Sequence, residues 1–144
     1  MPFFEIAKML LDAAKSILDV GDKLRKQRED QRERTAKSLE AIVVCLEAIA
    51  KSARAGQWDS LTGRCEELAI YLENFTKLQG LPDLIGAGPI DLLNRLADSV
   101  KARQGLVMAS SLTTGEEVHE APLAQLESAA GALRATAVLV RSIG

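Results

Sequence analysis

Residues Phe3 to Leu24 read FFEIAKMLLDAAKSILDVGDKL, and the prediction of the fold starts from this stretch. Six of its charged residues recur at steps of three or four, so they share one narrow stripe of an α-helix with 3.6 residues per turn. This polar stripe alternates in sign and consists of Glu5, Lys8, Asp12, Lys15, Asp19 and Lys23. Most of the remaining residues are apolar, which inverts the proportions of an ordinary surface helix. The helix must therefore be enclosed, either by other helices or by lipid.

Length and composition predict one helical domain that covers residues 1–144. The chain is 47% hydrophobic but only 3% aromatic, and its many alanines and leucines are typical of closely packed helices. A chain of this size buries roughly 68–70% of its unfolded surface, which is enough for a core. We expect an all-α four-helix bundle with the hydrophobic N-terminal helix packed centrally, short connecting helical turns and no sheet.

A strongly charged segment, RKQREDQRERTAKS at residues 25–38, follows the opening helix. Ala36 is its only apolar side chain, so no face of it is expected to pack in a core. From Asp22 to Lys37 there are seven basic and four acidic residues, a net charge of +3. One interpretation is a solvated connection of mixed charge, which is either a turn region or a helix that projects beyond the bundle. The other is a basic collar that meets anionic lipid head groups through Arg25, Lys26, Arg28, Arg32 and Arg34.

The later helices are predicted from their apolar periodicity. One helix covers Leu39–Ala55 and stops at Gly56; the next is capped by Asp59 or Ser60 and ends at Gly80. After a break at residues 81–89, Pro89 opens a further helix, and after a loop at 111–122 Pro122 opens the last one. The predicted apolar stripes of the second, third and last helices are Leu39, Ile42, Val43, Leu46, Ile49, Ala50 and Ala53; Trp58, Leu61, Cys65, Leu68, Leu72 and Phe75; and Leu123, Leu126, Ala130, Leu133, Ala137 and Val140.

Catalytic and metal-binding patterns are missing from the sequence. It contains no P-loop, no dinucleotide fingerprint, no Gly-x-Ser-x-Gly and no Cys–His pairing, so we expect no enzyme and no cofactor. His119 is the only histidine and lies in a predicted loop, which predicts solvation rather than a metal site. Cys45 and Cys65 are expected to be buried free thiols. A net charge of −2 argues against non-specific nucleic-acid binding.

The N-terminal stretch is expected to be neither a signal peptide nor a constitutive membrane-spanning helix, because charges interrupt its apolar run. Two cysteines are too few for a disulfide scaffold, so we expect a cytoplasmic, reducing location.

The opening hydrophobic helix, the charged link and the further long helices together resemble the HeLo-like cell-death bundles. These include the N-terminal bundle of the mixed-lineage-kinase-like pseudokinase and the bacterial Bell domains. Residues 52–73 also resemble a segment of small uncharacterised bacterial helical proteins at Gly56, Gly63, Cys65 and Leu68. The resemblance implies a domain of bacterial immunity that permeabilises membranes when its first helix is released and several copies assemble. It also implies an upstream sensor protein as a partner.

Two functions are therefore carried forward. In the first, the chain is a membrane-perforating cell-death effector that is latent as a soluble bundle and associates with anionic lipid once its copies assemble. The residues expected to insert are Phe3, Phe4, Ile6, Met9, Leu10, Leu11, Ile17 and Leu18. In the second, it is a non-enzymatic helical adaptor that recruits a signalling partner through its helix faces.

Overall fold

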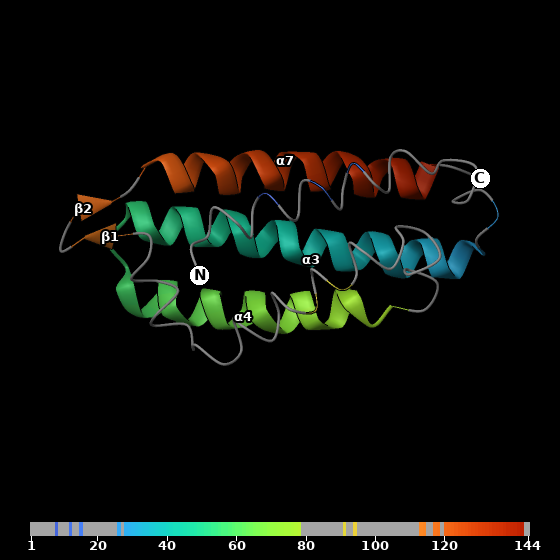
Figure 1. Cartoon of the computed structure of the whole chain (residues 1–144), viewed down its shortest axis with the longest axis horizontal. Helices are drawn as coiled ribbons and strands as arrows, with labels where there is room; N and C mark the ends of the chain where they lie inside the picture. The colour runs from blue at the N-terminus through green and yellow to red at the C-terminus, as the bar shows by residue number, and fades with distance from the viewer. Residues whose placement is uncertain are drawn as a thin grey trace.

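Three long helices form the part of the chain that the computed structural model describes. The described residues are Lys8, Asp12, Lys15, Lys26, 28–78, Asp91, Asn94, 113–114, 117–118 and 120–142. The long helices are α3 (Glu29–Arg54), α4 (Trp58–Thr76) and α7 (Glu120–Ser142). Figure 1 shows α3 lying between α7 and α4, with the three helices side by side. The regular secondary structure of the described residues is thus helical apart from one short strand pair, which agrees with the all-α prediction.

Helices α4 and α7 flank α3 on nearly opposite sides. The Cys45 thiol donates a hydrogen bond to the Arg64 carbonyl of α4, whereas the Glu47 carboxylate pairs with Arg134 of α7. Residues two positions apart project roughly 160° apart around a helix axis. Seven residues further on, Ser52 contacts Ser60 of α4 and Arg54 pairs with Glu127 of α7, which repeats the same arrangement. The three helices therefore form a layer with α3 in the middle.

One face of this layer is covered and the other is open to solvent. Leu46 lies between Cys45 and Glu47 in sequence, roughly 100° from each, and is 0% exposed. Val44 projects from the opposite side of α3 and is 64% exposed. The covered side of α3 carries residues at alternating steps of three and four that are all 0% exposed: Leu39, Ile42, Leu46, Ile49 and Ala53. We call these five residues the covered seam.

The contact between α3 and α7 has the spacing of an antiparallel coiled coil. Arg54 at the end of α3 pairs with Glu120 at the start of α7, and Glu33 near the start of α3 pairs with Arg141 near the end of α7. Both helices present buried residues at alternating steps of three and four, as coiled-coil packing requires. These are Ala36, Leu39, Val43, Leu46, Ala50 and Ala53 in α3, and Leu123, Leu126, Ala130, Leu133, Ala137 and Val140 in α7.

Helix α3 begins at Glu29, ten residues before the predicted start at Leu39. The expectation that no face of residues 25–38 could pack in a core is wrong, because Thr35 and Ala36 are both buried. Ala36 lies one heptad before Val43 and continues the seam toward α7. The Thr35 hydroxyl donates a hydrogen bond to the Gln31 carbonyl at 3.1 Å, which satisfies its polar group within the helix. The buried side chains of Ala36 and Thr35 are therefore enough to pack this part of α3, although the residues around them are charged.

The ends of the helices agree with the prediction in part. Gly56 follows α3 with a φ of 68°, the left-handed conformation expected of a glycine stop. The predicted cap of α4 is wrong, since Gln57 occupies the N-cap without a side-chain hydrogen bond and the Ser60 hydroxyl contacts Ser52 instead. Helix α4 also ends at Thr76 rather than at Gly80.

Helix α7 begins at Glu120, two residues before the predicted start at Pro122. Proline is tolerated there because the first N–H groups of a helix have no intrahelical partner.

The predicted loop at 111–122 contains a short strand pair. Strand β1 (Thr113–Thr114) pairs antiparallel with β2 (Glu117–Val118), with Thr113 opposite Val118. This local pairing corrects the expectation of no strand but adds no sheet layer to the fold. The predicted break at 81–89 and His119 lie outside the described residues. Of the helix predicted after Pro89, the structure describes Asp91 and Asn94, which are helical and exposed.

Candidate functional site

The structure describes three residues of the predicted polar stripe. Lys8, Asp12 and Lys15 all lie in helical backbone and have exposed side chains. Glu5, Asp19 and Lys23 lie outside the described residues. The same is true of the insertion candidates Phe3, Phe4, Ile6, Met9, Leu10, Leu11, Ile17 and Leu18.

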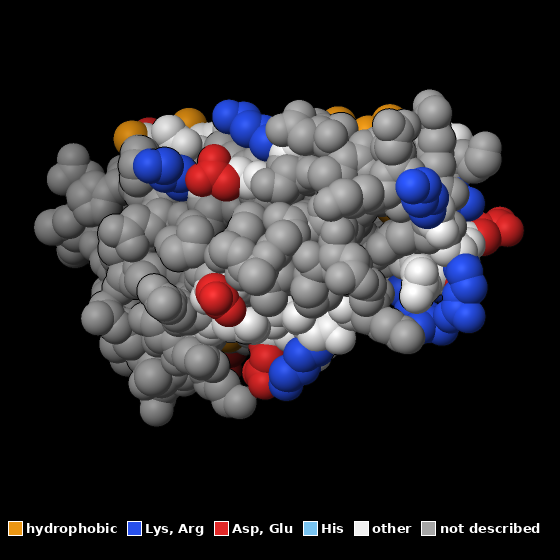
Figure 2. All heavy atoms as spheres, turned by 45° about the vertical axis from the view of Figure 1, so that its right-hand side comes forward, with side chains coloured by type: hydrophobic (Ala, Val, Ile, Leu, Met, Phe, Trp, Pro, Cys, Tyr) orange, Lys and Arg blue, Asp and Glu red, His pale blue; other side chains and the backbone are white. Residues whose placement is uncertain are grey.

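The described cations of the basic segment differ in their surroundings. Lys26 is exposed, whereas Arg28 and Arg34 both reach the Asp30 carboxylate, at 3.3 Å and 3.4 Å. Arg25 lies outside the described residues. Figure 2 shows lysine and arginine side chains gathered at the end of the molecule where α3 begins, with an acidic side chain nearby. The paired arginines remain more than half exposed, so their charge still contributes to a basic end of the layer.

Arg32 differs from the other candidates because it is half-buried. Its Nε and Nη1 atoms are buried and have no hydrogen-bond partner in the part of the chain that the structure describes. A buried donor without a partner loses its hydration without compensation. Arg32 is therefore less suited to meeting a flat head-group surface than the sequence suggested.

Charged residues also line the outer edge of the α3–α7 contact at seven-residue intervals. The α3–α7 ladder consists of Glu33, Glu40, Glu47 and Arg54 in α3 and of Glu120, Glu127, Arg134 and Arg141 in α7. Arg141 pairs with both Glu33 and Glu40, Arg134 pairs with Glu47, and Arg54 pairs with both Glu120 and Glu127. Every ladder residue thus has a partner of opposite charge on the other helix.

The charges of the ladder favour one orientation of α7 relative to α3. The sign changes from acidic to basic at Arg54 in α3, and it changes from acidic to basic between Glu127 and Arg134 in α7. A parallel arrangement would bring the acidic start of α7 beside the acidic start of α3. Like charges placed in contact are destabilising. The ladder therefore specifies the antiparallel orientation as well as contributing attraction.

The ion pairs shift the pKa values of their members. A hydrogen bond from Arg141 lowers the pKa of Glu33, and a hydrogen bond from Arg54 lowers the pKa of Glu127. The carboxylates of Glu127 and Glu120 raise the pKa of Arg54. These groups remain charged at neutral pH, but they are solvent-exposed, so each pair is screened by salt.

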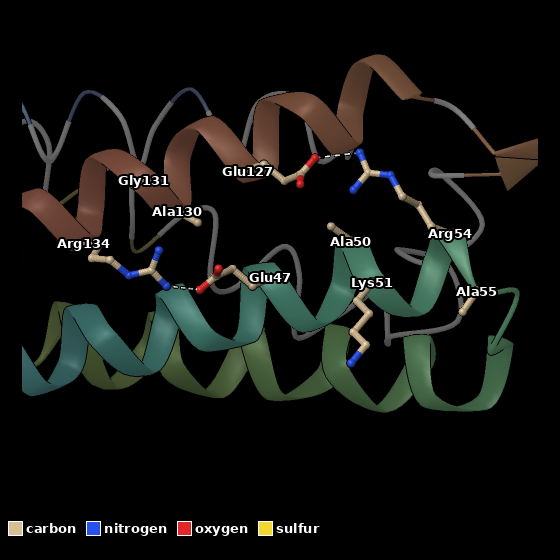
Figure 3. A pocket seen from close by; sticks show the side chains of 9 residues that line it. All are labelled: Glu47, Ala50, Lys51, Arg54, Ala55, Glu127, Ala130, Gly131 and Arg134. Carbon is tan, nitrogen blue, oxygen red and sulfur yellow. Dashed lines mark hydrogen bonds and ion pairs between the residues drawn. The ribbon is translucent and has the colours of Figure 1, made fainter.

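A hollow of about 780 Å³ opens between two rungs of the ladder. Ala50, Ala130 and Gly131 line it between the Glu47–Arg134 and Arg54–Glu127 pairs. Figure 3 shows these two pairs reaching across from opposite helices, while Lys51 turns away from α7. The hollow exists because the buried residues of α3 and α7 that meet here, Ala50 and Ala130, both have small side chains. Its lining contains no thiol, hydroxyl or imidazole side chain, and its carboxylates are engaged with arginines, so it offers no pair of free acid and base.

Cys45 and Cys65 are buried free thiols, as predicted. They are 1% and 0% exposed, and this burial raises the pKa of each thiol to about 12. The thiolate is the reactive form of cysteine, so both side chains are protonated and inert at neutral pH.

Neither a cluster of metal ligands nor a membrane-spanning helix occurs among the described residues. Within these ranges, no group of three or more His, Cys, Asp or Glu residues could hold a metal ion. Among the described helices, none is both long enough and apolar enough to cross a membrane.

Comparisons of the chain with protein-family models, with curated proteins and with solved structures found no match. The resemblance to HeLo-like bundles therefore depends on the sequence pattern alone. The sequence prediction missed the ladder, although Glu33, Glu40, Glu47 and Arg54, and likewise Glu120, Glu127, Arg134 and Arg141, recur at intervals of seven in the sequence.

Proposed function

We propose that this chain is a membrane-perforating cell-death effector domain, latent as a cytoplasmic four-helix bundle and active when copies assemble and insert the N-terminal helix. The observation that supports it best is the exposure of Lys8, Asp12 and Lys15 on helical backbone. These side chains occupy one stripe of a segment whose other residues are mostly apolar. A helix with its charges turned to solvent keeps its apolar surface available for burial elsewhere.

In the latent state, the apolar side of the Phe3–Leu24 helix covers the seam formed by Leu39, Ile42, Leu46, Ile49 and Ala53. The support is that all five residues are 0% exposed although α4 and α7 lie on opposite flanks of α3, and that Ile42 and Ile49 are not part of the seam toward α7. The N-terminal helix thereby completes the fourth position of the bundle. It also keeps its own apolar surface away from water.

In the active state, the helix crosses the bilayer as one of several copies. The 22 residues of Phe3–Leu24 span roughly 33 Å, close to the roughly 30 Å of bilayer hydrocarbon. A lone helix with this polar stripe would be unstable in lipid, but a ring of copies can turn the stripe toward a water-filled lumen. Residues of alternating sign on neighbouring copies then pair. Lys26 and the exposed arginines after it lie at the anionic head groups.

Two attachments keep the rest of the layer together when the N-terminal helix leaves. The α3–α7 ladder and coiled-coil seam hold α7, and the buried stripe of Leu61, Leu68, Leu72 and Phe75 holds α4. Release therefore uncovers one side of α3, including Ile42 and Ile49, without requiring the whole domain to unfold.

The test is dye release from anionic liposomes, paired with toxicity on expression in bacteria. Wild type is expected to release dye, less so in neutral liposomes and at high salt. Leu10→Glu and Leu11→Glu are expected to abolish release in variants whose folding has been verified. Val44→Glu is the matched control, because it also adds a glutamate but at a position that is already 64% exposed.

Wild type that neither leaks liposomes nor harms cells, even when a fused oligomerising partner clusters it, would overturn the proposal. Leakage that survives both leucine substitutions would remove this helix as the agent.

A second function, an adaptor that recruits a signalling protein, is favoured by the large apolar side chains on the exposed surface. Val44, Ile70 and Val138 are 64%, 57% and 63% exposed, one on each long helix. The two functions differ in their use of Phe3 and Leu11. For an adaptor, polar replacements there lower stability without a separate loss of activity, and a partner such as an upstream sensor co-purifies with the chain in the absence of lipid.

A further inference from the structure

Arg32 differs from the other arginines that the structure describes, because its charge has no partner. Its Nε and Nη1 atoms are buried and make no hydrogen bond within the described part of the chain. Of the carboxylates nearest in sequence, Asp30 binds two other arginines and Glu33 binds Arg141. The third, Glu29, is exposed. The remaining described arginines each pair with a carboxylate, and they are Arg28, Arg34, Arg54, Arg64, Arg134 and Arg141.

The position of Arg32 is one that favours an apolar side chain. Leu39, Leu46 and Ala53 follow it at intervals of seven residues, and all three are 0% exposed. Residues that recur at this interval share one side of a helix. Arginine does not lose its proton in a protein, so the charge of Arg32 persists on burial. Because a buried charge without a partner destabilises a fold, the chain gives up stability at this position.

A bend in the backbone lies one turn before Arg32. Lys26 is helical, whereas Arg28 is extended, with φ −67° and ψ 151°, and α3 begins at the next residue. A helix that precedes Arg28 must therefore turn there in order to lie along α3. In the latent arrangement proposed above, the end of the Phe3–Leu24 helix lies beside the first turns of α3, which contain Arg32.

The ends of α4 and α7 lie close to the level of Arg32. Glu33 pairs with Arg141, and α7 ends at the next residue, so this helix stops level with Arg32. Helix α4 ends at Thr76, short of that level (Figure 1). Neither helix continues past Arg32, so burial of its guanidinium group needs a further segment of the chain.

We propose that Arg32 is a release switch for the N-terminal helix: its unpaired charge destabilises the closed bundle, and departure of the Phe3–Leu24 helix returns the guanidinium group to water. The apolar residues of the covered seam favour the closed state, and Arg32 opposes them. The inference rests on the proposed function and describes its regulation. Its tests use no lipid, so failure of the switch and failure of membrane activity can be told apart.

The first experiment compares the thermal unfolding of two variants of the full chain by circular dichroism. Arg32→Met is expected to raise the melting temperature, because methionine fills much of the same volume without a charge. Arg34→Met is the matched control: it removes the same charge from the same segment, but the Arg34 side chain is 58% exposed and pairs with Asp30. A melting temperature that does not rise in Arg32→Met, or that rises equally in both variants, overturns the proposal.

The second experiment measures how often the covered seam opens, by the rate of thiol labelling with a maleimide. Ile42→Cys places a reporter thiol at a position that is 0% exposed and lies outside the seam toward α7. In this background, Arg32→Met is expected to slow labelling by about tenfold or more, which corresponds to about 1.4 kcal/mol. Arg34→Met is expected to change the rate by about twofold or less. Ile49→Cys is the second reporter, to be used if Ile42→Cys impairs folding.

The native thiols control for unfolding of the whole domain. Cys45 and Cys65 are 1% and 0% exposed at the α3–α4 contact, which release leaves closed. They are expected to react more slowly than the reporter thiol, and equal rates at all three positions would contradict the release of a single helix. A higher melting temperature of Arg32→Met without slower labelling of the reporter would show that Arg32 stays buried when the seam opens, which also contradicts the switch.

Discussion

The two contacts of α3 are built in different ways. Toward α7, both helices contribute a mixture of large and small apolar residues and a charged ladder outside them. Toward α4, the contact is made by large apolar side chains such as Leu68 and Phe75, together with the Cys45 and Ser52 hydrogen bonds. The ion pairs described on α4, Arg64–Glu67 and Lys77–Glu73, join residues of that helix and its C-cap to one another. The α7 contact thus combines buried apolar residues with charge pairs between the helices, whereas the described α4 contact depends on buried volume and two hydrogen bonds.

The largest expected effect is the removal of volume from α4. Phe75→Ala is expected to lower the free energy of unfolding by about 3–5 kcal/mol, because Phe75 is 1% exposed and its ring leaves a cavity. Urea denaturation followed by circular dichroism measures this change. Ile70→Ala on the same helix is the control and should change stability by about 0.5 kcal/mol or less, since Ile70 is 57% exposed. Equal effects would contradict the assignment of the α4 contact.

The second expected effect is overpacking of the α7 contact. Ala137 is 1% exposed and faces α3 in the seam, so Ala137→Leu is expected to cost about 1–3 kcal/mol by forcing the helices apart. The same denaturation experiment measures it. Ala121→Leu adds the same atoms at an exposed position of α7 and is expected to be nearly neutral. Tolerance of leucine at position 137 would show that α7 is not held at a fixed distance from α3.

These two contacts also explain which parts of the fold could be predicted. The steps of three and four identified the buried stripes of α3, α4 and α7, because a residue that recurs at the helical period must share a face with its neighbours. A helical reading of residues 29–38 was one of the interpretations and is confirmed, but their packing was not predicted, because only Thr35 and Ala36 are buried and the charged residues around them concealed the pattern. Single packed residues at a helix end leave too weak a periodicity to detect.

The ladder and the hollow depend on information that one sequence does not contain. Glu47 and Arg134 are far apart in the chain, and only the register of α7 on α3 brings them together. The hollow likewise forms because Ala50 and Ala130 lie at the same level. The seven-residue spacing of the charges was visible in the sequence, but it indicates a ladder only after the two helices have been paired.

A smaller effect is expected from reversing one rung of the ladder. Glu47→Arg places two cations together and is expected to destabilise the chain by about 0.2–1 kcal/mol, the range for exposed pairs. The double variant Glu47→Arg with Arg134→Glu restores opposite charges and is expected to recover most of that loss. Measuring the cycle at low and high salt separates charge from packing, because only the charge component is screened. If the double variant is no more stable than the summed free-energy changes of the two single variants predict, the Glu47–Arg134 pair contributes nothing.

The smallest effect is a pH dependence that arises from the carboxylates of the ladder. The pKa of Glu33 is lowered by its hydrogen bond with Arg141 and by the charges of Arg141 and Lys37, and that of Glu127 is lowered by Arg54. A carboxyl group whose pKa is lower in the folded chain stabilises the fold at pH values above its ordinary pKa of 4.5. This contribution is lost as the pH falls from that value through the lowered pKa of the folded state.

The melting temperature is therefore expected to decrease as the pH is lowered below about 4.5. The decrease should be less steep in Glu127→Gln, because this variant has already lost one of the two carboxylates. The effect is small because both carboxylates are solvent-exposed, and it should shrink further in high salt. Glu66→Gln is the control, because Glu66 is exposed on α4, away from the ladder. If Glu66→Gln flattened the acid profile as much as Glu127→Gln, the pH dependence would reflect the overall charge of the chain rather than the specific ion pairs between α3 and α7.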